Sequence, residues 1–230
     1  MACFILSRKK RRKFRDKHVY TSYQNGNQVL LILPDGREKL IKHHIYGLNV
    51  TFYGKENILK INEPENQIHD ISVVFLGNNA TAVVKNNVYC QLSSGCEFFI
   101  DKSSYVNDGG KFWLCEDGAK IIIGKDCAIS WNVEFMGVDH HTILNDKGKV
   151  CNYPQTIEIR DHVWIGSGVK ISKGVIVAEN NIIGMGSIVT KSFLETNCII
   201  AGNPAKIVKK NINWNVDAIS KYIAEHPKAK

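Results

Sequence analysis

An aliphatic residue recurs at every sixth position from Ile159 onward, and this period limits the possible folds more than any other feature of the chain. The first register contains Ile159, Ile165, Ile171, Val177, Ile183 and Val189. The second register lies four residues later in each hexad and contains Val163, Val169, Val175, Asn181, Ser187 and Phe193. An α-helix would need apolar residues three and four positions apart, and the glycines between residues 166 and 186 would destabilise it. The period therefore excludes a helix.

Hexapeptide periodicity is typical of a parallel β-helix, in which three hexads form one coil. Apolar residues stack inward, small residues occupy the corners, and neighbouring coils lie one strand spacing apart, roughly 4.8 Å. The same period continues upstream through Ile123, Ile129 and Phe135. Between residues 45 and 135 we expect coils with longer and less regular rungs, because turn residues recur there without strict hexads. The sequence therefore predicts an all-β solenoid.

Four segments are expected along the chain. Residues 1–17 form a basic arm, 18–44 a β-hairpin-like cap, 45–212 the β-helix and catalytic domain, and 213–230 a C-terminal helix and tail. The cap rests on two turn signals that flank the apolar residues from Val29 to Leu33. Apolar spacing over 214–226 predicts the helix, with Asn213 or Asn215 as its N-cap, placed to cover the end of the solenoid.

The period is interrupted between His141 and Ile157. The inward register runs through residues 129, 135 and 141 and resumes only at 159, so residues 142–156 are expected to protrude as a loop. A loop of this length is either a tolerated insertion or a functional element. We favour a functional element, because the loop begins directly after the polar run Asp139, His140 and His141.

Most of the positive charge lies in one short segment. The formal net charge is +8, and residues 8–17 alone hold eight Lys or Arg and one Asp. Such an arm is either a solvated terminus or a peripheral contact with anionic lipid or an acidic glycan. Nucleic acid is disfavoured, because the arm has no interleaved aromatic residues and no nucleic-acid-binding motif follows it.

The seven cysteines include no C-x-x-C pair, which favours reduced, structural thiols over disulfides or a cysteine zinc site. No window of the chain approaches the roughly 18 apolar residues that span a bilayer, and no secretory signal is recognisable at residues 1–6. A cytoplasmic protein is therefore expected, with the arm able to hold it at the inner face of the membrane.

Four segments carry a family resemblance: 138–142 (VDHHT), 162–167 (HVWIGS), 184–191 (GMGSIVTK) and 201–208 (AGNPAKIV). In this order and spacing they resemble the hexapeptide-repeat acetyltransferases, especially the polysaccharide O-acetyltransferase, galactoside and maltose acetyltransferase branch. The resemblance covers residues 118–212. It implies a left-handed β-helix, a homotrimer with its sites between subunits, and acetyl-CoA as cosubstrate without a metal. It leaves the N-terminal 110 residues, which we expect to shape acceptor choice, unmatched.

The resemblance also implies roles for single residues. His141 occupies the position of the catalytic base, because the family pattern places one histidine two residues after the aspartate. A neutral imidazole can take the proton of an attacking hydroxyl. Asp139 would orient the imidazole or bind a sugar hydroxyl. His140 is the lesser candidate for the base.

Acetyl-CoA would contact small residues and basic groups near the corners of the later coils. The implied cofactor residues are Trp164, Ser167, Met185, Ser187, Thr190, Lys191, Lys206 and Lys209. Lys206 and Lys209 occupy basic positions that face phosphates in the family, where some members carry Arg; Lys keeps the charge but not the bidentate fork. For Trp164, packing between subunits is an equally good interpretation.

The expected function is therefore acetyl transfer from acetyl-CoA to a hydroxyl of a surface saccharide or its precursor. The first alternative is an N-acetyltransferase acting on an amino-sugar nucleotide. Two others are a zinc lyase of the γ-carbonic-anhydrase kind, suggested by His140, His141 and His162, and a non-catalytic glycan-binding solenoid.

Overall fold

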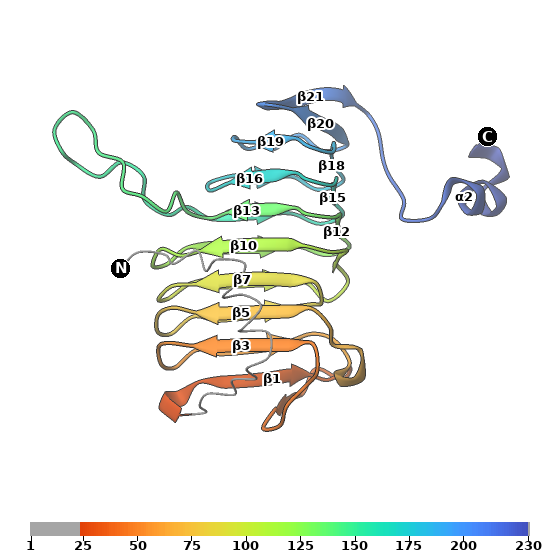
Figure 1. Ribbon diagram of the computed structural model, residues 1–230. Coiled ribbons are helices and arrows are strands. Elements are labelled where there is room, and N and C mark those ends of the chain that lie inside the picture. Colours follow the sequence, from red (N-terminus) through yellow and green to blue (C-terminus); the bar gives the residue numbers. More distant parts are fainter. Residues whose placement is uncertain (1–23, 230) are drawn as a thin grey trace.

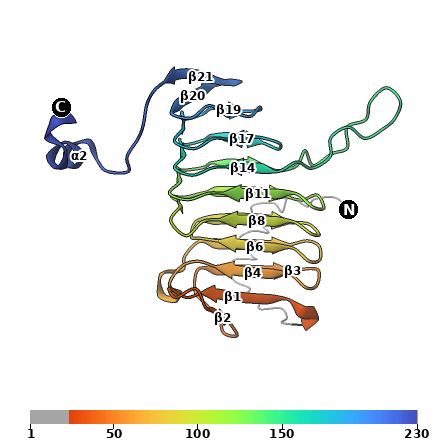
Figure 2. The same cartoon turned by 180° about the vertical axis from the view of Figure 1, so that it is seen from behind.

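The protein is a solenoid whose three walls are β-sheets, called sheets A, B and C (Figures 1 and 2). The computed structural model describes residues 24–229. The predicted basic arm and residues 18–23 of the predicted cap lie outside the described residues. No helix in the described part of the chain is both long and apolar enough to cross a membrane.

The strands of each wall lie side by side, and their order is counted from the C-terminal end of the solenoid. Sheet A contains β17 (Ile176–Val177), β14 (Ile157–Ile159), β11 (Lys120–Ile123), β8 (Glu97–Ile100), β6 (Thr81–Val84), β4 (Ile58–Ile61), β1 (Gln28–Ile32) and β2 (Glu38–Leu40). Sheet B contains β19 (Ile188–Val189), β16 (Lys170–Ser172), β13 (Glu134–Met136), β10 (Gly110–Leu114), β7 (Val88–Leu92), β5 (Ile71–Phe75) and β3 (Leu48–Phe52). Sheet C contains β21 (Ala205–Lys210), β20 (Cys198–Gly202), β18 (Ile182–Ile183), β15 (Trp164–Ile165), β12 (Ala128–Ile129) and β9 (Tyr105–Val106).

One hexad supplies one wall of each later coil. From β8 to β19 the chain visits sheets A, C and B in rotation. Ile159 pairs in parallel with Val177, three hexads later. Every residue of both registers is buried, because alternate residues of a strand point to opposite faces and one face lines the interior. These three parallel sheets are those of a left-handed β-helix, so the predicted fold class is confirmed.

The N-terminal coils are less regular than the later ones. From β2 to β7 the strands alternate between sheets A and B, and turns together with the short 3-10 helix η2 (Glu65–Gln67) form the third side. A further 3-10 turn, η1 (Gln24–Gly26), precedes β1. β1 pairs in parallel with β4 on one edge and in antiparallel fashion with β2 on the other, with Leu30 opposite Leu40. The antiparallel pair closes sheet A at its N-terminal end.

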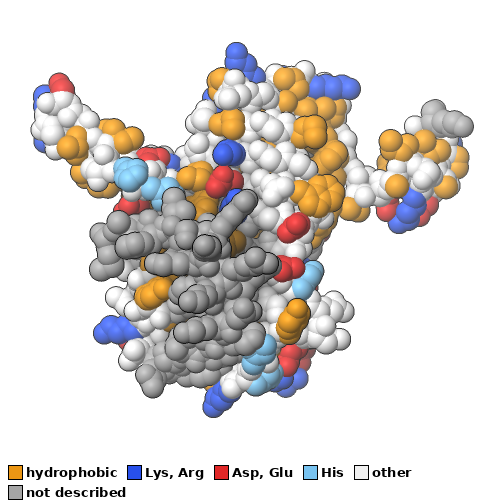
Figure 3. Space-filling model, viewed as in Figure 1, with side chains coloured by type: hydrophobic (Ala, Val, Ile, Leu, Met, Phe, Trp, Pro, Cys, Tyr) orange, Lys and Arg blue, Asp and Glu red, His pale blue; other side chains and the backbone are white. Residues whose placement is uncertain are grey.

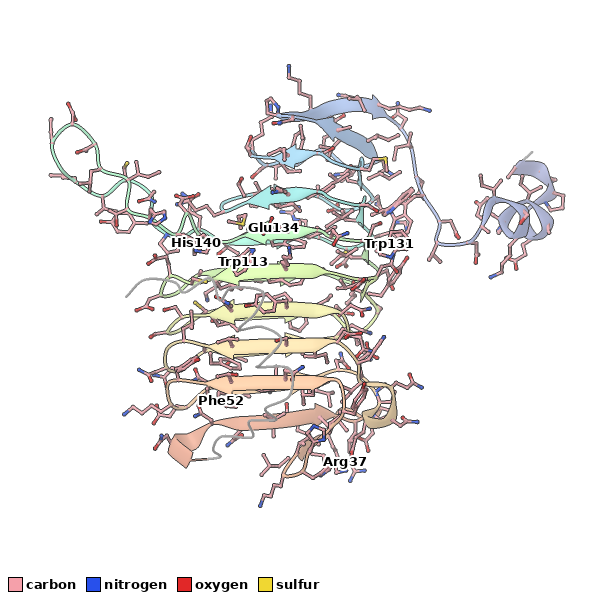
Figure 4. All side chains as sticks on the ribbon, viewed as in Figure 1. Arg37, Phe52, Trp113, Trp131, Glu134 and His140 are labelled. Atoms are coloured by element: carbon pink, nitrogen blue, oxygen red, sulfur yellow. The ribbon has the colours of Figure 1, made fainter. Side chains whose placement is uncertain are left out.

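Stacked phenylalanine rings fill the middle of the solenoid. Phe98 and Phe112 lie with their ring centroids 4.4 Å apart, and Phe112 and Phe135 with theirs 4.8 Å apart. A second stack joins Phe52, labelled in Figure 4, to Phe75 at 4.9 Å. Phe112 and Phe135, like Phe52 and Phe75, are register partners on successive coils, whereas Phe98 meets Phe112 from the neighbouring wall, and burial of the rings stabilises the fold.

The inward-facing polar residue Asn181 forms hydrogen bonds with backbone groups at a corner of the solenoid. Asn181, an exception in the apolar register, donates hydrogen bonds to the carbonyl groups of Ala178 (3.0 Å) and Glu195 (2.8 Å). Its Oδ1 accepts a hydrogen bond from the backbone N–H of Cys198 at 2.7 Å. The Asn181 side chain therefore hydrogen-bonds to backbone groups that have no strand partner where the chain turns from one wall to the next. Burying this amide costs little free energy, because its polar atoms all have hydrogen-bond partners.

The described cysteines are free thiols, and most of them line the interior. Burial raises the pKa of Cys96 and of Cys127 to about 11. Because the thiolate is the reactive form of cysteine, these two thiols are inert structural groups at neutral pH.

The C-terminal helix differs from its prediction in two respects. The helix α2 spans Ile219–Glu225 and is followed by the 3-10 turn η3 (Pro227–Ala229). It stands away from the solenoid on an extended segment, so it does not cover the solenoid end (Figures 1 and 2). The antiparallel pair β20 and β21 lies at that end instead.

The predicted N-cap is also wrong. Ala218 occupies the N-cap position and makes no side-chain capping bond. Asn213 Oδ1 accepts a hydrogen bond from the backbone of Trp214 (2.9 Å), and Asn215 Oδ1 accepts one from Asp217 (2.8 Å). Both asparagines therefore stabilise local turns before the helix, a use that competes with capping.

Candidate functional site

The loop leaves the solenoid where the chain passes from sheet B to sheet A, a region called the B/A corner (residues 137–156, 173–175 and 190–192). β13 ends at Met136 and β14 begins at Ile157, as the interruption of the period predicted. The loop projects far from the solenoid on the side opposite the C-terminal helix (Figures 1 and 3). Its outer part is a narrow hairpin with an antiparallel bridge between Leu144 and Val150.

Asp139, at the outgoing stem of this loop, accepts two strong hydrogen bonds. Lys173 Nζ lies 2.6 Å from Asp139 Oδ2, and Asn152 Nδ2 donates to the same oxygen at 2.9 Å. Asn152 belongs to the returning stem, so its side chain joins the two stems. Asn152 Nδ2 also donates to the carbonyl oxygen of His141 (2.7 Å), and Asn152 Oδ1 accepts from the backbone of Ile143 (2.9 Å).

The charge of Asp139 is stabilised by these partners. Partial burial raises the pKa of its carboxyl group, but the hydrogen bonds from Lys173 and Asn152 outweigh that effect and lower the pKa below its ordinary value. Asp139 is therefore an anion at neutral pH and serves as a fixed acceptor rather than as an acid.

His141 has an exposed side chain that makes no hydrogen bond to any residue of the described range 24–229. Its backbone, by contrast, is held by Asn152. This combination keeps the imidazole available at the base of the loop while fixing the point from which it projects. A base that must approach a bound hydroxyl needs both properties.

His140 faces a different set of groups. Its backbone has a positive φ of 62°, and its ring meets Trp113 edge-on with the centroids 5.9 Å apart. Trp113 Nε1 donates a hydrogen bond to Glu134 Oε1 at 2.8 Å. Figure 4 shows these three side chains beside the base of the loop. His140 is thus packed against sheet B, whereas His141 is not.

Two predicted cofactor residues lie at a second edge, the C/B corner, where the chain passes from sheet C to sheet B. Ser167 and Met185 occupy equivalent positions in adjacent coils, since the N–H of Gly186 bonds to the carbonyl of Ser167. Met185 is 79% exposed. The two coils approach each other closely at this corner, because a Cβ added to Gly166 would lie only 2.7 Å from the backbone nitrogen of Met185. The corner presents backbone and small side chains to a ligand.

The interpretation of Ser187 requires correction. Its side chain is buried, its hydroxyl donates to the carbonyl of Gly184 (2.6 Å), and it accepts from the N–H of Gly202 (3.1 Å). Both contacts stabilise the turn from inside the coil. Ser187 therefore has no surface to offer to a cofactor, and it is not among the proposed cofactor contacts.

Trp164, Lys206 and Lys209 share the outer face of sheet C. Trp164 pairs with Ile182, Ile182 with Ile199, and Ile199 with Lys209, so these positions form one column across the sheet. The Trp164 side chain also contacts Trp214 of the C-terminal segment, with ring centroids 6.0 Å apart. Both lysines are exposed on β21, with Lys209 at the C-terminal end of this column and Lys206 opposite Ala201.

Thr190 and Lys191 lie at the B/A corner, the same edge as the loop. Ile171 pairs with Val189, so Lys173 and Lys191 occupy equivalent positions in adjacent coils. Lys191 Nζ lies 5.7 Å from the centre of the Phe193 ring. Within one chain, the predicted site residues are therefore divided between two corners and one sheet face.

Sequence reasoning missed Asn152 and Lys173, which hold the loop. A signal for Lys173 existed in the hexads, because its position follows the inward Ile171 by two residues, as Gly137 follows Phe135. Counting hexads across the interruption would have placed Lys173 in the next coil, beside the residues where the loop begins. No comparable signal points to Asn152, which lies in the aperiodic segment.

The third histidine of the zinc alternative is remote from the loop. His162 lies where the chain passes from sheet A to sheet C, and its ring stacks on Trp214 at 4.4 Å. Trp214 Nε1 donates to the carbonyl of His162 at 2.9 Å, which anchors the C-terminal segment. Within residues 24–229, no three His, Cys, Asp or Glu side chains are grouped so as to hold a metal ion.

Comparison with known proteins shows clear relatives, although no protein-family model matches the chain. Polysialic acid O-acetyltransferase of Neisseria meningitidis is 36% identical over 203 residues, which make up 86% of this chain and 89% of that protein. Galactoside O-acetyltransferase of Escherichia coli K12 is 32% identical over 142 residues, 61% of this chain and 66% of that protein. The solved structure of the polysialic acid O-acetyltransferase OatWY superposes with a TM-score of 0.66 at 29% identity, covering 80% of this chain and 98% of that one.

The shared solenoid and the extent of these similarities define an acetyltransferase. The chain belongs to the hexapeptide-repeat acetyltransferase family, with polysialic acid and galactoside O-acetyltransferases among its relatives. The family and enzyme class expected from the four sequence segments are thereby confirmed.

Proposed function

We propose that this protein transfers an acetyl group from acetyl-CoA to a hydroxyl of a saccharide, with His141 as the general base. The observation that carries the proposal is the base of the loop. There the His141 imidazole is exposed, and Asn152 links the His141 backbone to the ionised Asp139. This is the arrangement that proton removal from an alcohol requires.

The proposed reaction needs a single base, which takes a proton from the acceptor and later returns it to the leaving group. The imidazole of His141 takes the proton of the acceptor hydroxyl while that oxygen attacks the thioester carbonyl. The new C–O bond forms, the C–S bond breaks, and the imidazolium returns the proton to the leaving CoA sulfur. Backbone N–H groups at a neighbouring coil are suitable donors to the transient oxyanion.

The cofactor is proposed to lie along sheet C and the C/B corner. Ser167, Met185 and Trp164 would line the pantetheine path, and Lys206 and Lys209 would face the phosphates, because both are exposed cations at one end of the same face. Thr190 and Lys191 would complete the site from the B/A corner. Since these positions surround different edges of one solenoid, we propose a homotrimer in which each site combines edges of two subunits.

The proposed acceptor is a polysaccharide of the polysialic acid type. The relative with 36% identity carries that substrate in its name, and the match extends over most of both chains. The acceptor test incubates the enzyme and acetyl-CoA with oligosialic acid, a neutral galactoside and an amino-sugar nucleotide, and it detects products by mass spectrometry. O-acetylated oligosialic acid is expected. Acetylation of the galactoside alone would change the acceptor, and product on the amine alone would replace O-transfer by N-transfer.

Binding of acetyl-CoA can be tested without an acceptor. A ligand present at about 100 times its Kd adds about 2.7 kcal/mol of stability, so the melting temperature should rise clearly. The rise should be smaller for Lys206→Glu, which reverses a proposed phosphate contact. Lys55→Glu, an exposed lysine near the N-terminal end, makes the same charge change as a control. No rise for the unmodified protein at millimolar acetyl-CoA would contradict the proposed cosubstrate.

A further inference from the structure

Lys173 supplies the hydrogen bonds by which the described part of the solenoid holds the loop. Within residues 24–229, every hydrogen bond that joins loop residues 138–156 to the rest of the chain comes from the Lys173 ammonium group. The loop's other hydrogen bonds, including the backbone bonds of its hairpin, stay inside it. A single side chain therefore supplies the polar contacts that join the base of the loop to the solenoid, beside the packing of Val138 in the core and of His140 on Trp113.

The ammonium group reaches both stems of the loop at once. Lys173 Nζ lies 2.6 Å from Asp139 Oδ2 on the outgoing stem. On the returning stem it donates to the carbonyl oxygens of Asn152 (2.6 Å) and Tyr153 (3.1 Å). An ammonium group has three N–H donors, and each of them has an acceptor in this arrangement. The Lys173 side chain is only 15% exposed, so solvent screens these contacts weakly.

The contacts of Lys173 continue directly to His141. Asp139 Oδ2 accepts from both Lys173 and Asn152 Nδ2, and the same Asn152 nitrogen donates to the His141 carbonyl. Lys173, Asp139 and Asn152 are thus one network, called the loop clamp, that ends on the backbone of His141. Loss of the ammonium group would leave Asp139 with one donor fewer and remove the hydrogen bonds that tie both stems to the solenoid.

We infer that Lys173 is a positioning residue for acetyl transfer, acting through Asp139 and Asn152 to hold His141 in place at the base of the loop. The inference rests on the proposed role of His141 as the base. Misplacement of a catalytic group by about 1 Å can cost about 10²-fold in rate, so a loosened stem is sufficient to slow the reaction.

The first test compares Lys173→Met with Lys120→Met in the full-length protein. Lys120 is the control, since it lies beside the end of the loop, where Ile121 pairs with Ile157, but its ammonium group forms its ion pair with Glu97 of sheet A at 2.8 Å. For Lys173→Met we expect kcat to fall at least about 10-fold while KM for acetyl-CoA stays within about twofold, because the bonds of the clamp go to loop residues rather than to the proposed cofactor residues. Lys120→Met should retain both constants. A kcat for Lys173→Met within twofold of the unmodified enzyme overturns the inference.

Chemical rescue separates a positioning role of Lys173 from a general loss of structure. In Lys173→Ala, added ethylammonium should restore part of kcat by supplying a cation to the three oxygens, whereas it should not change the activity of Lys120→Met. Failure of this rescue, together with a similar fall for Lys120→Met, would assign the loss to global destabilisation and overturn the inference.

Hydrogen exchange tests the clamp without any catalysis. Amides of residues 138–156 should exchange faster in Lys173→Met, while those of β15 and β18 keep their protection. Unchanged exchange in the loop would show that Lys173 does not hold it. If the unmodified enzyme bound acetyl-CoA but acetylated no acceptor, the proposed function would fail while the exchange experiment still judged the clamp.

A double-mutant cycle examines whether the clamp acts as one unit. Asn152→Ala removes the bonds to Asp139 and His141, so adding Lys173→Met should reduce kcat by much less than the product of the single effects. Independent, multiplicative effects would mean that the two side chains act separately, which contradicts the network.

Discussion

Replacing His141 with alanine is expected to lower the turnover number for saccharide acetylation by at least about 10²-fold, because general-base catalysis contributes about 10²- to 10⁴-fold. Acetyl-CoA should still raise the melting temperature of this variant, since His141 lies at the B/A corner and the proposed phosphate contacts lie on sheet C. The measurement is initial rate at saturating acetyl-CoA, with thermal unfolding of the same samples. Turnover within a few fold of the unmodified enzyme would remove His141 as the base.

His140→Ala is the matched control for this prediction, because it makes the same change at the neighbouring position. The His140 ring packs edge-on against Trp113 rather than pointing freely from the loop. We expect its removal to have a much smaller effect on turnover than His141→Ala. If the two variants exchanged their effects, the base would be His140, the lesser candidate from the sequence.

The second large effect is expected in the core. Phe98 and Phe99 are neighbours on β8, but Phe98 is 1% exposed inside the solenoid and Phe99 is 39% exposed on its outer face. Phe98→Ala removes a ring packed 4.4 Å from that of Phe112 and leaves a cavity. The expected loss is about 3–5 kcal/mol of unfolding free energy.

Phe99→Ala deletes the same atoms from the outer face of the same strand, and it should cost about 1 kcal/mol or less. Urea denaturation of both variants gives the comparison, at equal protein concentration so that association contributes equally. Equal losses for the two variants would mean that the inward and outward faces of β8 are wrongly assigned.

The fold could be predicted because it depends mainly on a pattern of residues that are close together in the sequence. One inward aliphatic residue per hexad places one strand on each wall, and Ile159 then lies beside Val177 without any distant information. The regular coils, the position of the loop and the family followed from this period and from four short segments. The N-terminal coils were harder to predict in detail, because their rungs lack a strict hexad and their strands alternate between two walls.

The candidate site was only partly predictable, because it depends on contacts between coils. His141 and Asp139 were found from a short motif, but their partner Lys173 belongs to the next coil and Asn152 to the far end of the loop. Ser187 was wrongly assigned because a small residue in this motif can point either to the solenoid interior or to its surface. In this protein its hydroxyl points inward and donates to the carbonyl of Gly184. The C-terminal helix was misplaced because local propensity does not reveal what a helix packs against.

By itself, the sequence determined the solenoid, the interruption at residues 142–156 and the acetyltransferase family, since each depends on residue types at short, regular spacing. Only the tertiary structure decided that one ammonium group fastens the loop and that the C-terminal helix stands clear of the solenoid end. The reason is physical. Inward apolar residues make the same stacking contacts in every coil, whereas a hydrogen bond across an insertion depends on where the two stems of the loop return in space.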